Sequence, residues 1–165
     1  MAMEVRLRDF LDQHGIAYSV FNHARAATAQ AMAAATHISG KAVAKTVILK
    51  KDNEPAMVVL PANHAVDLHA LGELLGGTVR LAREDELQEL FPGCELGAMS
   101  PFGNLYDLPV WVAEPLAEDD EIVFNAGTHT EAVRMRYQDY ARLVSPHVVR
   151  CSHEVSSEPR REPDW

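Results

Sequence analysis

Residues 42–60 read AVAKTVILKKDNEPAMVVL, and this stretch decides the fold. Two apolar runs rich in Val, Ile and Leu lie on either side of the segment 51–55, KDNEP, whose Asp, Asn and Pro are typical of turns. Such a pattern predicts two antiparallel strands joined by a short turn. We therefore expect a central hairpin with its strands at 42–50 and 56–60.

Helical and extended patterns alternate irregularly on both sides of this hairpin. The apolar positions of 3–14 and 68–75 have helical spacing, and Asp67 is placed to cap the second of these helices. Hairpin-like pairs are frequent, so we expect a mixed α/β (α+β) domain rather than a doubly wound parallel sheet. The other expected helices are 28–35, 84–90 and 137–144, and the other expected strands are 16–21, 79–82, 109–113, 121–125 and 130–136.

Composition and charge limit the classes of function. The chain has 165 residues, of which 47% are hydrophobic and 24% charged, so it suits one globular domain and excludes a disordered or fibrous chain. Lys and Arg number 15 against 24 Asp and Glu, which gives a formal net charge of -9. Because no field of the whole chain attracts DNA or an anionic membrane, any nucleic-acid contact must use a local basic patch.

Cysteine usage and hydropathy indicate a cytoplasmic protein. Cys94 and Cys151 lie far apart, so they form neither a disulfide framework nor a CxxC metal site, which points to a reducing compartment. The first ten residues carry charges where a signal peptide needs an apolar run, and no stretch approaches the roughly 18 apolar residues of a membrane span. The polar, Pro-containing residues 152–165 are expected to form a flexible tail.

The loop 97–103, GAMSPFG, is a candidate binding element. Its two glycines and one proline surround a small polar residue, a composition that lets backbone N–H groups approach a ligand closely. It can form a cradle for an anion or an oxyanion. An ordinary glycine-rich crossover whose Phe102 packs into the core explains the same composition.

The segment 125–129, NAGTH, is a second candidate. It follows an apolar run, so Gly127 can turn the backbone while His129 presents its imidazole at the end of a strand, for substrate contact or proton transfer. The structural alternative is a half-buried histidine that is hydrogen-bonded to a backbone carbonyl.

Lys45 is unusual because it lies inside an apolar strand pattern. A lysine on a semi-enclosed face can hold a phosphate or a developing negative charge. Alternatively, it lies on the solvent face and belongs to a basic edge with Lys41, Lys50 and Lys51.

Metal sites and covalent catalysis have little support. The nearest pairs of possible metal ligands are His64 with His69 and Cys151 with His153, and neither pair has a recognised ligand spacing. No G-x-S-x-G elbow or P-loop occurs, so neither Ser nor Cys has the context of a nucleophile. We expect no metal and no cofactor.

Three elements taken together resemble the motif set of the YbaK/prolyl-tRNA synthetase-associated editing domain family. They are Lys45-Thr46 in an apolar strand, the 97–103 loop and 124–129, FNAGTH, and their order and separation match as well. The resemblance covers residues 4–150 and implies a single compact domain, which we expect at 1–151, with a curved mixed β-sheet flanked by helices. It also implies a free-standing enzyme that hydrolyses the ester of wrongly charged aminoacyl-tRNA.

The resemblance carries over to individual residues. It implies catalytic parts for Lys45, Gly103 and His129, and it implies that the 97–103 loop lines the aminoacyl pocket. The Gly-Thr-His form is closer to the alanine-specific members than to the cysteine-specific ones, so alanine is the first expected substrate. The expected substrate-binding residues are Thr46, Gly97, Ala98, Met99, Ser100, Pro101, Phe102, Gly127 and Thr128.

The implied reaction needs neither a metal nor an enzyme nucleophile. A positioned water can cleave the activated ester while loop N–H groups and Lys45 stabilise charge on the carbonyl oxygen, and a ribose hydroxyl of the tRNA can assist. A small pocket then selects by size. A non-catalytic tRNA- or nucleotide-binding module of the same fold and a metal-dependent hydrolase that uses the histidines remain alternatives.

The expected partner is a mischarged tRNA, and a synthetase or an elongation factor is a further candidate; DNA and membranes are not expected partners. In a chain with a net charge of -9, the tRNA contact must come from the basic cluster near 41–51, together with Arg134 and Arg136.

Overall fold

The structure is a computed structural model that describes residues 5–23, 33 and 41–155. The central hairpin is confirmed: β2 (Ala44–Lys51) pairs with β3 (Glu54–Pro61) in antiparallel register, with Lys45 opposite Leu60. Two residues, Asp52 and Asn53, form the turn with φ of 49° and 72°. Both values lie in the left-handed region, which Asp and Asn tolerate and which the favoured two-residue hairpin turn requires.

This hairpin is the centre of a five-stranded mixed sheet in the order β5-β2-β3-β6-β9. The edge strand β5 (Val79–Leu81) pairs antiparallel with β2, whereas β6 (Val110–Ala113) runs parallel to β3 and β9 (His147–Val149) runs parallel to β6. The sequence-based expectation of a mixed α/β class is therefore confirmed.

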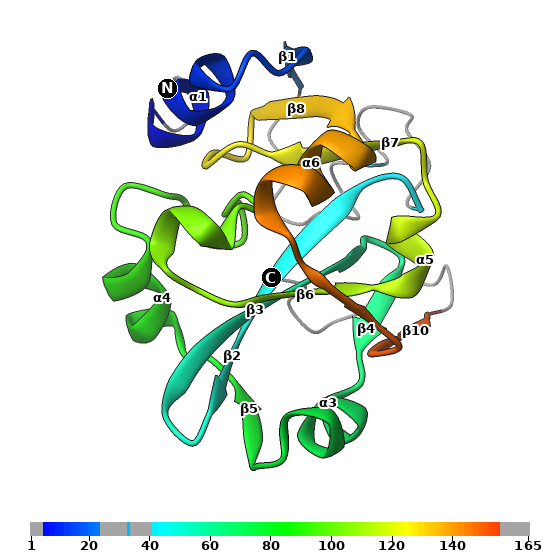
Figure 1. Cartoon of the computed structure of the whole chain (residues 1–165). Helices are drawn as coiled ribbons and strands as arrows, with labels where there is room; N and C mark the ends of the chain where they lie inside the picture. The colour runs from blue at the N-terminus through cyan, green and yellow to red at the C-terminus, as the bar shows by residue number, and fades with distance from the viewer. Residues whose placement is uncertain (1–4, 24–32, 34–40, 156–165) are drawn as a thin grey trace.

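A three-stranded antiparallel sheet lies beside the amino-terminal end of β2 (Figure 1). Its order is β1 (Tyr18–Asn22), β8 (Glu131–Arg136) and β7 (Glu121–Asn125). Val43 forms an isolated parallel bridge with Val123, and the Val123 N–H donates to the Ala42 carbonyl at 3.0 Å. This bridge joins the two sheets and brings the start of β2 next to β7.

The helices confirm most of the sequence-based expectations. They are α1 (Val5–Gln13), α3 (Leu68–Leu75), α4 (Glu84–Leu90), α5 (Glu114–Ala117) and α6 (Tyr137–Val144). Asp67 caps α3 as predicted, because its Oδ1 accepts a hydrogen bond of 3.0 Å from the Ala70 N–H. Helix α5 and a 3-10 helix, η1 (Gly103–Tyr106), were not anticipated, and the helix expected at 28–35 lies outside the described residues apart from residue 33.

The main core lies between the two larger sheets and is built on aromatic rings. The fully buried Phe102 ring lies 5.1 Å from the Tyr140 ring and 5.8 Å from the Phe124 ring, measured between centroids. Leu7 and Leu11 of α1 are also fully buried in this core. Burying one side chain of this size contributes about 1.5–3 kcal/mol, so these residues hold α1 and α6 against the sheets.

The C-terminal segment differs from the expected tail. Ser152–Glu154 form β10, which pairs antiparallel with β4 (His64–Val66). Cys151 is fully buried, and the Val155 N–H donates to the Asn63 carbonyl at 2.9 Å. Residues 152–155 are therefore part of the folded domain, because their backbone groups complete a two-stranded sheet.

Candidate active site

Two loops that are distant in the sequence are held together by backbone hydrogen bonds. The Glu95 N–H donates to the Gly127 carbonyl at 2.9 Å, and the Gly127 N–H donates to the Ala98 carbonyl at 2.8 Å. Gly97 and Gly127 have φ of 81° and 96°, a region that favours glycine. The structure thus brings the loop 97–103 next to the segment 127–129.

His129 lies at this junction and is only 6% exposed. Its Nε2 is within hydrogen-bond distance of the Leu96 carbonyl. Because a carbonyl can only accept, this contact requires a proton on Nε2, and in the tautomer protonated only at Nε2 the Nδ1 atom is an acceptor. Nδ1 is buried and has no hydrogen-bond partner among the described residues.

His129 therefore has features of both sequence-based interpretations. One ring nitrogen bonds a backbone carbonyl, as the structural alternative predicts, while the other presents a lone pair without a partner among the described residues. Buried polar atoms without partners are rare in native proteins and need an explanation. A ligand that donates a hydrogen bond is one such explanation.

Thr128 organises the turn that carries His129. The Thr128 side chain is 4% exposed, and its Oγ1 accepts a hydrogen bond of 3.2 Å from the Glu131 N–H. Such side-chain to backbone bonds stabilise turns. Asn125, three positions earlier, is 5% exposed. Its Oδ1 lies 3.3 Å from Nε2 of His23, the residue that follows β1.

The loop 97–103 is held from behind by the core. Residues 98–103 are all buried, and the Tyr140 hydroxyl donates to the Pro101 carbonyl at 2.7 Å. Phe102 packs in the core, as the ordinary-crossover alternative predicts, so its expected substrate contact has no support from its position. This packing gives the loop a rigid support.

Gly103 has a packing reason to be glycine. A Cβ at this position would lie 2.5 Å from Cγ2 of Val110 and 3.2 Å from the Leu108 carbonyl oxygen, and both distances are shorter than normal contacts. The Gly103 carbonyl accepts a hydrogen bond of 2.9 Å from the Leu108 N–H. The catalytic role of Gly103 stays a prediction, whereas its steric role follows directly from these contacts.

Lys45 and Thr46 are both buried, with exposed fractions of 6% and 5%. The solvent-face interpretation of Lys45 is therefore wrong. Strand alternation directs neighbouring side chains to opposite faces. Thr46 shares its face with Ala44 and Ile48, which belong to the main core that also contains Met99 and Phe102.

Lys45 lies on the other face, with Val47 and Leu49, which pack in a smaller core that includes Cys151. Burial lowers the pKa of the nearby His64, and the positive charge of Lys45 lowers it further. The start of β2 is joined to β7, the strand that leads into 125–129, so the lysine strand borders the same region as His129.

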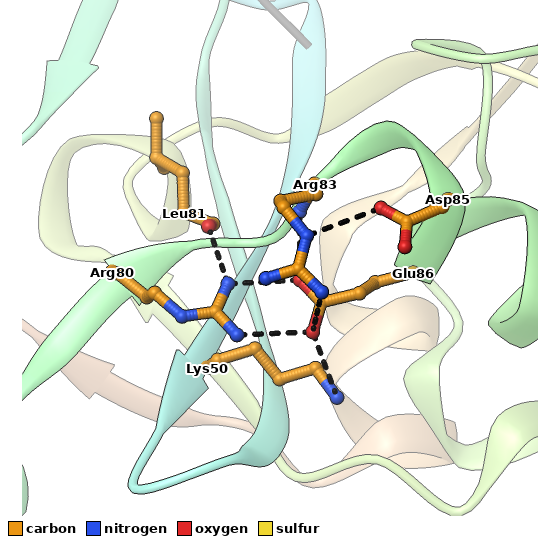
Figure 2. A network of polar contacts seen from close by, with 6 residues as sticks. All are labelled: Lys50, Arg80, Leu81, Arg83, Asp85 and Glu86. Carbon is orange, nitrogen blue, oxygen red and sulfur yellow. Dashed lines mark hydrogen bonds and ion pairs between the residues drawn. The ribbon is translucent and has the colours of Figure 1, made fainter.

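One lysine of the expected basic cluster, Lys50, is used within the protein, in a network with Arg80 and Arg83 (Figure 2). Arg80 makes two hydrogen bonds to the Glu86 carboxylate, of 2.8 and 3.0 Å, and Lys50 Nζ lies 3.6 Å from the same group. Arg83 adds a contact of 3.7 Å. Hydrogen bonds from Arg80 and from the backbone N–H of Arg83 lower the pKa of Glu86 to about 2.

Two of the cations that were expected to contact tRNA lie on β8. Arg134 and Arg136 are both exposed, and strand alternation directs them to the same face. Arg136 also donates to Gln138 Oε1 at 3.1 Å. By contrast, Lys41 lies near Asp119, where it opposes the rise in the pKa of this carboxyl that burial causes.

The other expectations concern metals, cysteines and membranes. Within residues 5–23, 33 and 41–155, no group of three His, Cys, Asp or Glu side chains is arranged to hold a metal ion. Cys94 and Cys151 are free thiols, and burial raises the pKa of Cys151 to about 11. None of the described helices is long and apolar enough to span a bilayer.

Sequence reasoning missed Glu95, Leu96 and Tyr140. Leu96 contributes its carbonyl to His129, Glu95 contacts both loops, and Tyr140 supports Pro101 from 39 positions away. The only signal for Glu95 and Leu96 in the sequence was their position directly before the glycine-rich loop. Tyr140 gave none, because it belongs to the regular pattern of a helix.

Two solved structures share this fold. The crystal structure of the hypothetical protein APE2540 has a TM-score of 0.81 at 20% identity and covers 90% of this chain and 99% of that one. A structure described as a proposed trans-editing enzyme for prolyl-tRNA synthetase has a TM-score of 0.78 at 22% identity, with 90% and 95% covered. These likenesses show that the chain has the fold of these two proteins.

The sequence comparison then identifies the family. The model of the aminoacyl-tRNA editing domain matches residues 23–143, and the chain belongs to this family. A curated relative, the multifunctional Ser/Thr-tRNA deacylase ProXp-y of Escherichia coli K12, is 33% identical over 154 residues, which are 87% of this chain and 89% of the relative. The protein is therefore an aminoacyl-tRNA hydrolase, and the resemblance seen in the sequence is confirmed.

Proposed function

We propose that the protein is a free-standing deacylase that removes serine or threonine from mischarged tRNA. The observation that carries this choice is the buried Nδ1 of His129, an acceptor without a partner among the described residues. The Escherichia coli relative, a Ser/Thr-tRNA deacylase, supports the same substrate class.

The preference for a hydroxyl follows from the chemistry of the neutral imidazole. The side-chain O–H of serine or threonine can donate to Nδ1, whereas the methyl group of alanine cannot. A site built to bond a substrate hydroxyl rejects an analogue that lacks it, because its own buried polar group is then left without a partner. This argument favours serine or threonine over alanine, the substrate expected from the Gly-Thr-His form.

Water is the nucleophile in the proposed reaction. Its oxygen attacks the ester carbonyl carbon, the bond from that carbon to the ribose oxygen breaks, and the ribose oxygen takes up a proton. The products are the free amino acid and uncharged tRNA. N–H groups of the loop 97–103 would stabilise the oxyanion, and charge stabilisation is strongest in a buried, preorganised site. We assign the Lys45 ammonium the same role from the start of β2, which the Val43–Val123 bridge joins to β7. No metal or cofactor has a part in this proposal.

The proposed partner is the mischarged tRNA, in the cytoplasm. Arg134 and Arg136 on β8 are the exposed cations nearest in sequence to His129, and we assign them the contact with the tRNA phosphates. Docking to a synthetase or an elongation factor stays a prediction.

The test measures release of labelled amino acid from tRNAs charged with serine, threonine, alanine, cysteine and proline, with EDTA present. We expect turnover on the seryl or threonyl species at least tenfold faster than on the alanyl species. A faster alanyl reaction would restore the alanine expectation. Retained tRNA binding without turnover on any species would support the non-catalytic module, and loss of activity in EDTA would support a metal-dependent hydrolase.

A pair of variants tests the role of His129. His129→Ala should lower the seryl rate strongly and change the alanyl rate little, because only the first substrate uses the acceptor. His69→Ala is the matched control, since the His69 side chain is 87% exposed and lies on α3. Equal losses on both substrates in His129→Ala would contradict the hydroxyl contact.

A further inference from the structure

Glu95 connects the two loops of the site through three of its groups. Its N–H donates to the Gly127 carbonyl at 2.9 Å, and its carbonyl accepts from the Ala98 N–H at 3.0 Å. Its side-chain Oε1 accepts a hydrogen bond of 3.2 Å from the His129 N–H. One half-buried residue therefore contacts both loops.

The side-chain contact has a direct consequence for His129. The backbone N–H of a buried residue needs an acceptor, and the Glu95 carboxylate supplies it. The next residue, Leu96, supplies the carbonyl that holds Nε2 of the ring. The backbone and the ring of His129 are thus held by two successive residues, and the ring contact determines which nitrogen carries the proton.

We propose that Glu95 is a positioning residue of the deacylation site. Its carboxylate accepts the hydrogen bond of the His129 N–H at a distance set by the length of the side chain, and this bond keeps His129 Nδ1 directed to the substrate hydroxyl. The proposal rests on the proposed function of His129. It predicts that the length and the oxygen of the Glu95 side chain matter more to the position of His129 than its negative charge does.

Two substitutions separate reach from charge. Glu95→Gln keeps the length and an amide oxygen that can accept from the His129 N–H, and it removes the charge. Glu95→Asp keeps the charge and is shorter by one methylene, so it cannot span the present distance without movement of the backbone. Glu89→Gln is the control, because Glu89 is exposed on α4.

The first readout is single-turnover deacylation of seryl-tRNA and threonyl-tRNA. We expect Glu95→Gln to stay within about threefold of the wild-type rate and Glu95→Asp to lose about tenfold or more, since small displacements of a positioned group have large effects on rate. The reverse order, with Gln impaired and Asp active, would overturn the proposal and assign Glu95 a charge-based role, such as binding the ammonium group of the aminoacyl ester.

The second readout needs no substrate. Imidazole ¹⁵N shifts of His129, assigned by their loss in His129→Ala, report which ring nitrogen carries the proton. We expect the Nε2-protonated pattern in the wild type and in Glu95→Gln, and a changed pattern in Glu95→Asp. An unchanged pattern in Glu95→Asp would overturn the proposal even where its activity falls.

The two readouts distinguish the failure of this inference from that of the proposed function. The site can show no preference for seryl or threonyl esters while the ¹⁵N shifts of His129 still depend on the side-chain length at position 95. That result would refute the proposed substrate and leave the positioning role of Glu95 intact. A far-ultraviolet spectrum and an unfolding curve for each variant show that it is folded, and Glu95→Gln stays informative where Glu95→Asp does not fold.

Discussion

Nearly all the buried polar side chains in the described residues come from the motifs that the sequence singled out. Burial of a polar group costs free energy unless it gains partners, so such residues are found where function or a hydrogen-bond network requires them. His64 is the exception, and its Nδ1 lies 2.9 Å from Ser152 Oγ on β10. The buried polar residues are Lys45, Thr46, His64, Ser100, Asn125, Thr128 and His129.

Lys45 offers a first prediction at the scale of the residue. Lys45→Ala should lower the rate of deacylation by about 10²-fold or more, because a preorganised charge that stabilises an oxyanion in a buried site is worth that much. Single-turnover release of the amino acid measures the effect, and His69→Ala, whose side chain is 87% exposed on α3, is the control. A Lys45→Ala rate within about twofold of wild type would contradict the charge-stabilising role.

Gly103 offers a second prediction. Gly103→Ala should destabilise the fold by about 1–3 kcal/mol, the usual cost of overpacking, because the new methyl group would meet Val110 and the Leu108 carbonyl. Denaturant unfolding measures this free energy directly. A variant as stable as the wild type but inactive would show that the residue acts in catalysis and that its packing is unimportant.

At the scale of elements, α4 is attached to the sheet by the Glu86 carboxylate and three cations from β2, β5 and the start of the helix (Figure 2). Such contacts are individually weak on a protein surface, but here they converge on a side chain that is only 12% exposed. The cluster thus has a structural role, and it occupies Lys50, one of the cations of the expected patch for tRNA.

Glu86 predicts a pH dependence of stability. Its pKa is about 2 in the folded protein, below the ordinary value of 4.5, so the stabilisation is fully present above about pH 4.5 and is lost as the pH falls toward 2. In Glu86→Gln the decrease in the free energy of unfolding over this range should therefore be smaller than in the wild type. Urea unfolding at successive pH values measures it, with Glu89→Gln as the control; identical curves for Glu86→Gln and wild type would contradict the linkage.

Elements were predictable where they are long enough to show a period or carry a cap. The β2–β3 turn and the Asp67 cap are local signals, and both were found where expected. The strands β4, β9 and β10 were not predicted; they have three residues each and exist because a partner strand supplies their hydrogen bonds. For the same reason, the sequence placed the start of the tail at Ser152, inside β10. The strand β5 is equally short, but it was expected at 79–82.

At the scale of the whole molecule, a protein with a net charge of -9 must bind tRNA through a restricted surface. We predict that replacement of both Arg134 and Arg136 by Ala weakens tRNA binding similarly for all tRNAs and reduces the slope of log affinity against log salt by about 1 for each lost phosphate contact. Binding measured over a salt series tests this. Arg150→Ala, whose side chain is 91% exposed between β9 and β10, is the control; equal effects of both changes would place the tRNA elsewhere.

The sequence by itself determined the class of fold, the hairpin and the two glycine-containing loops, because alternation, turn residues and caps act over a few positions. Only the tertiary structure decided that Lys45 is buried, that Lys50 pairs with Glu86, and that Glu95 and Leu96 hold His129. Each of these depends on contacts between segments far apart in the chain. Burial and hydrogen-bond partners belong to the packed molecule, and no local pattern of residues specifies them.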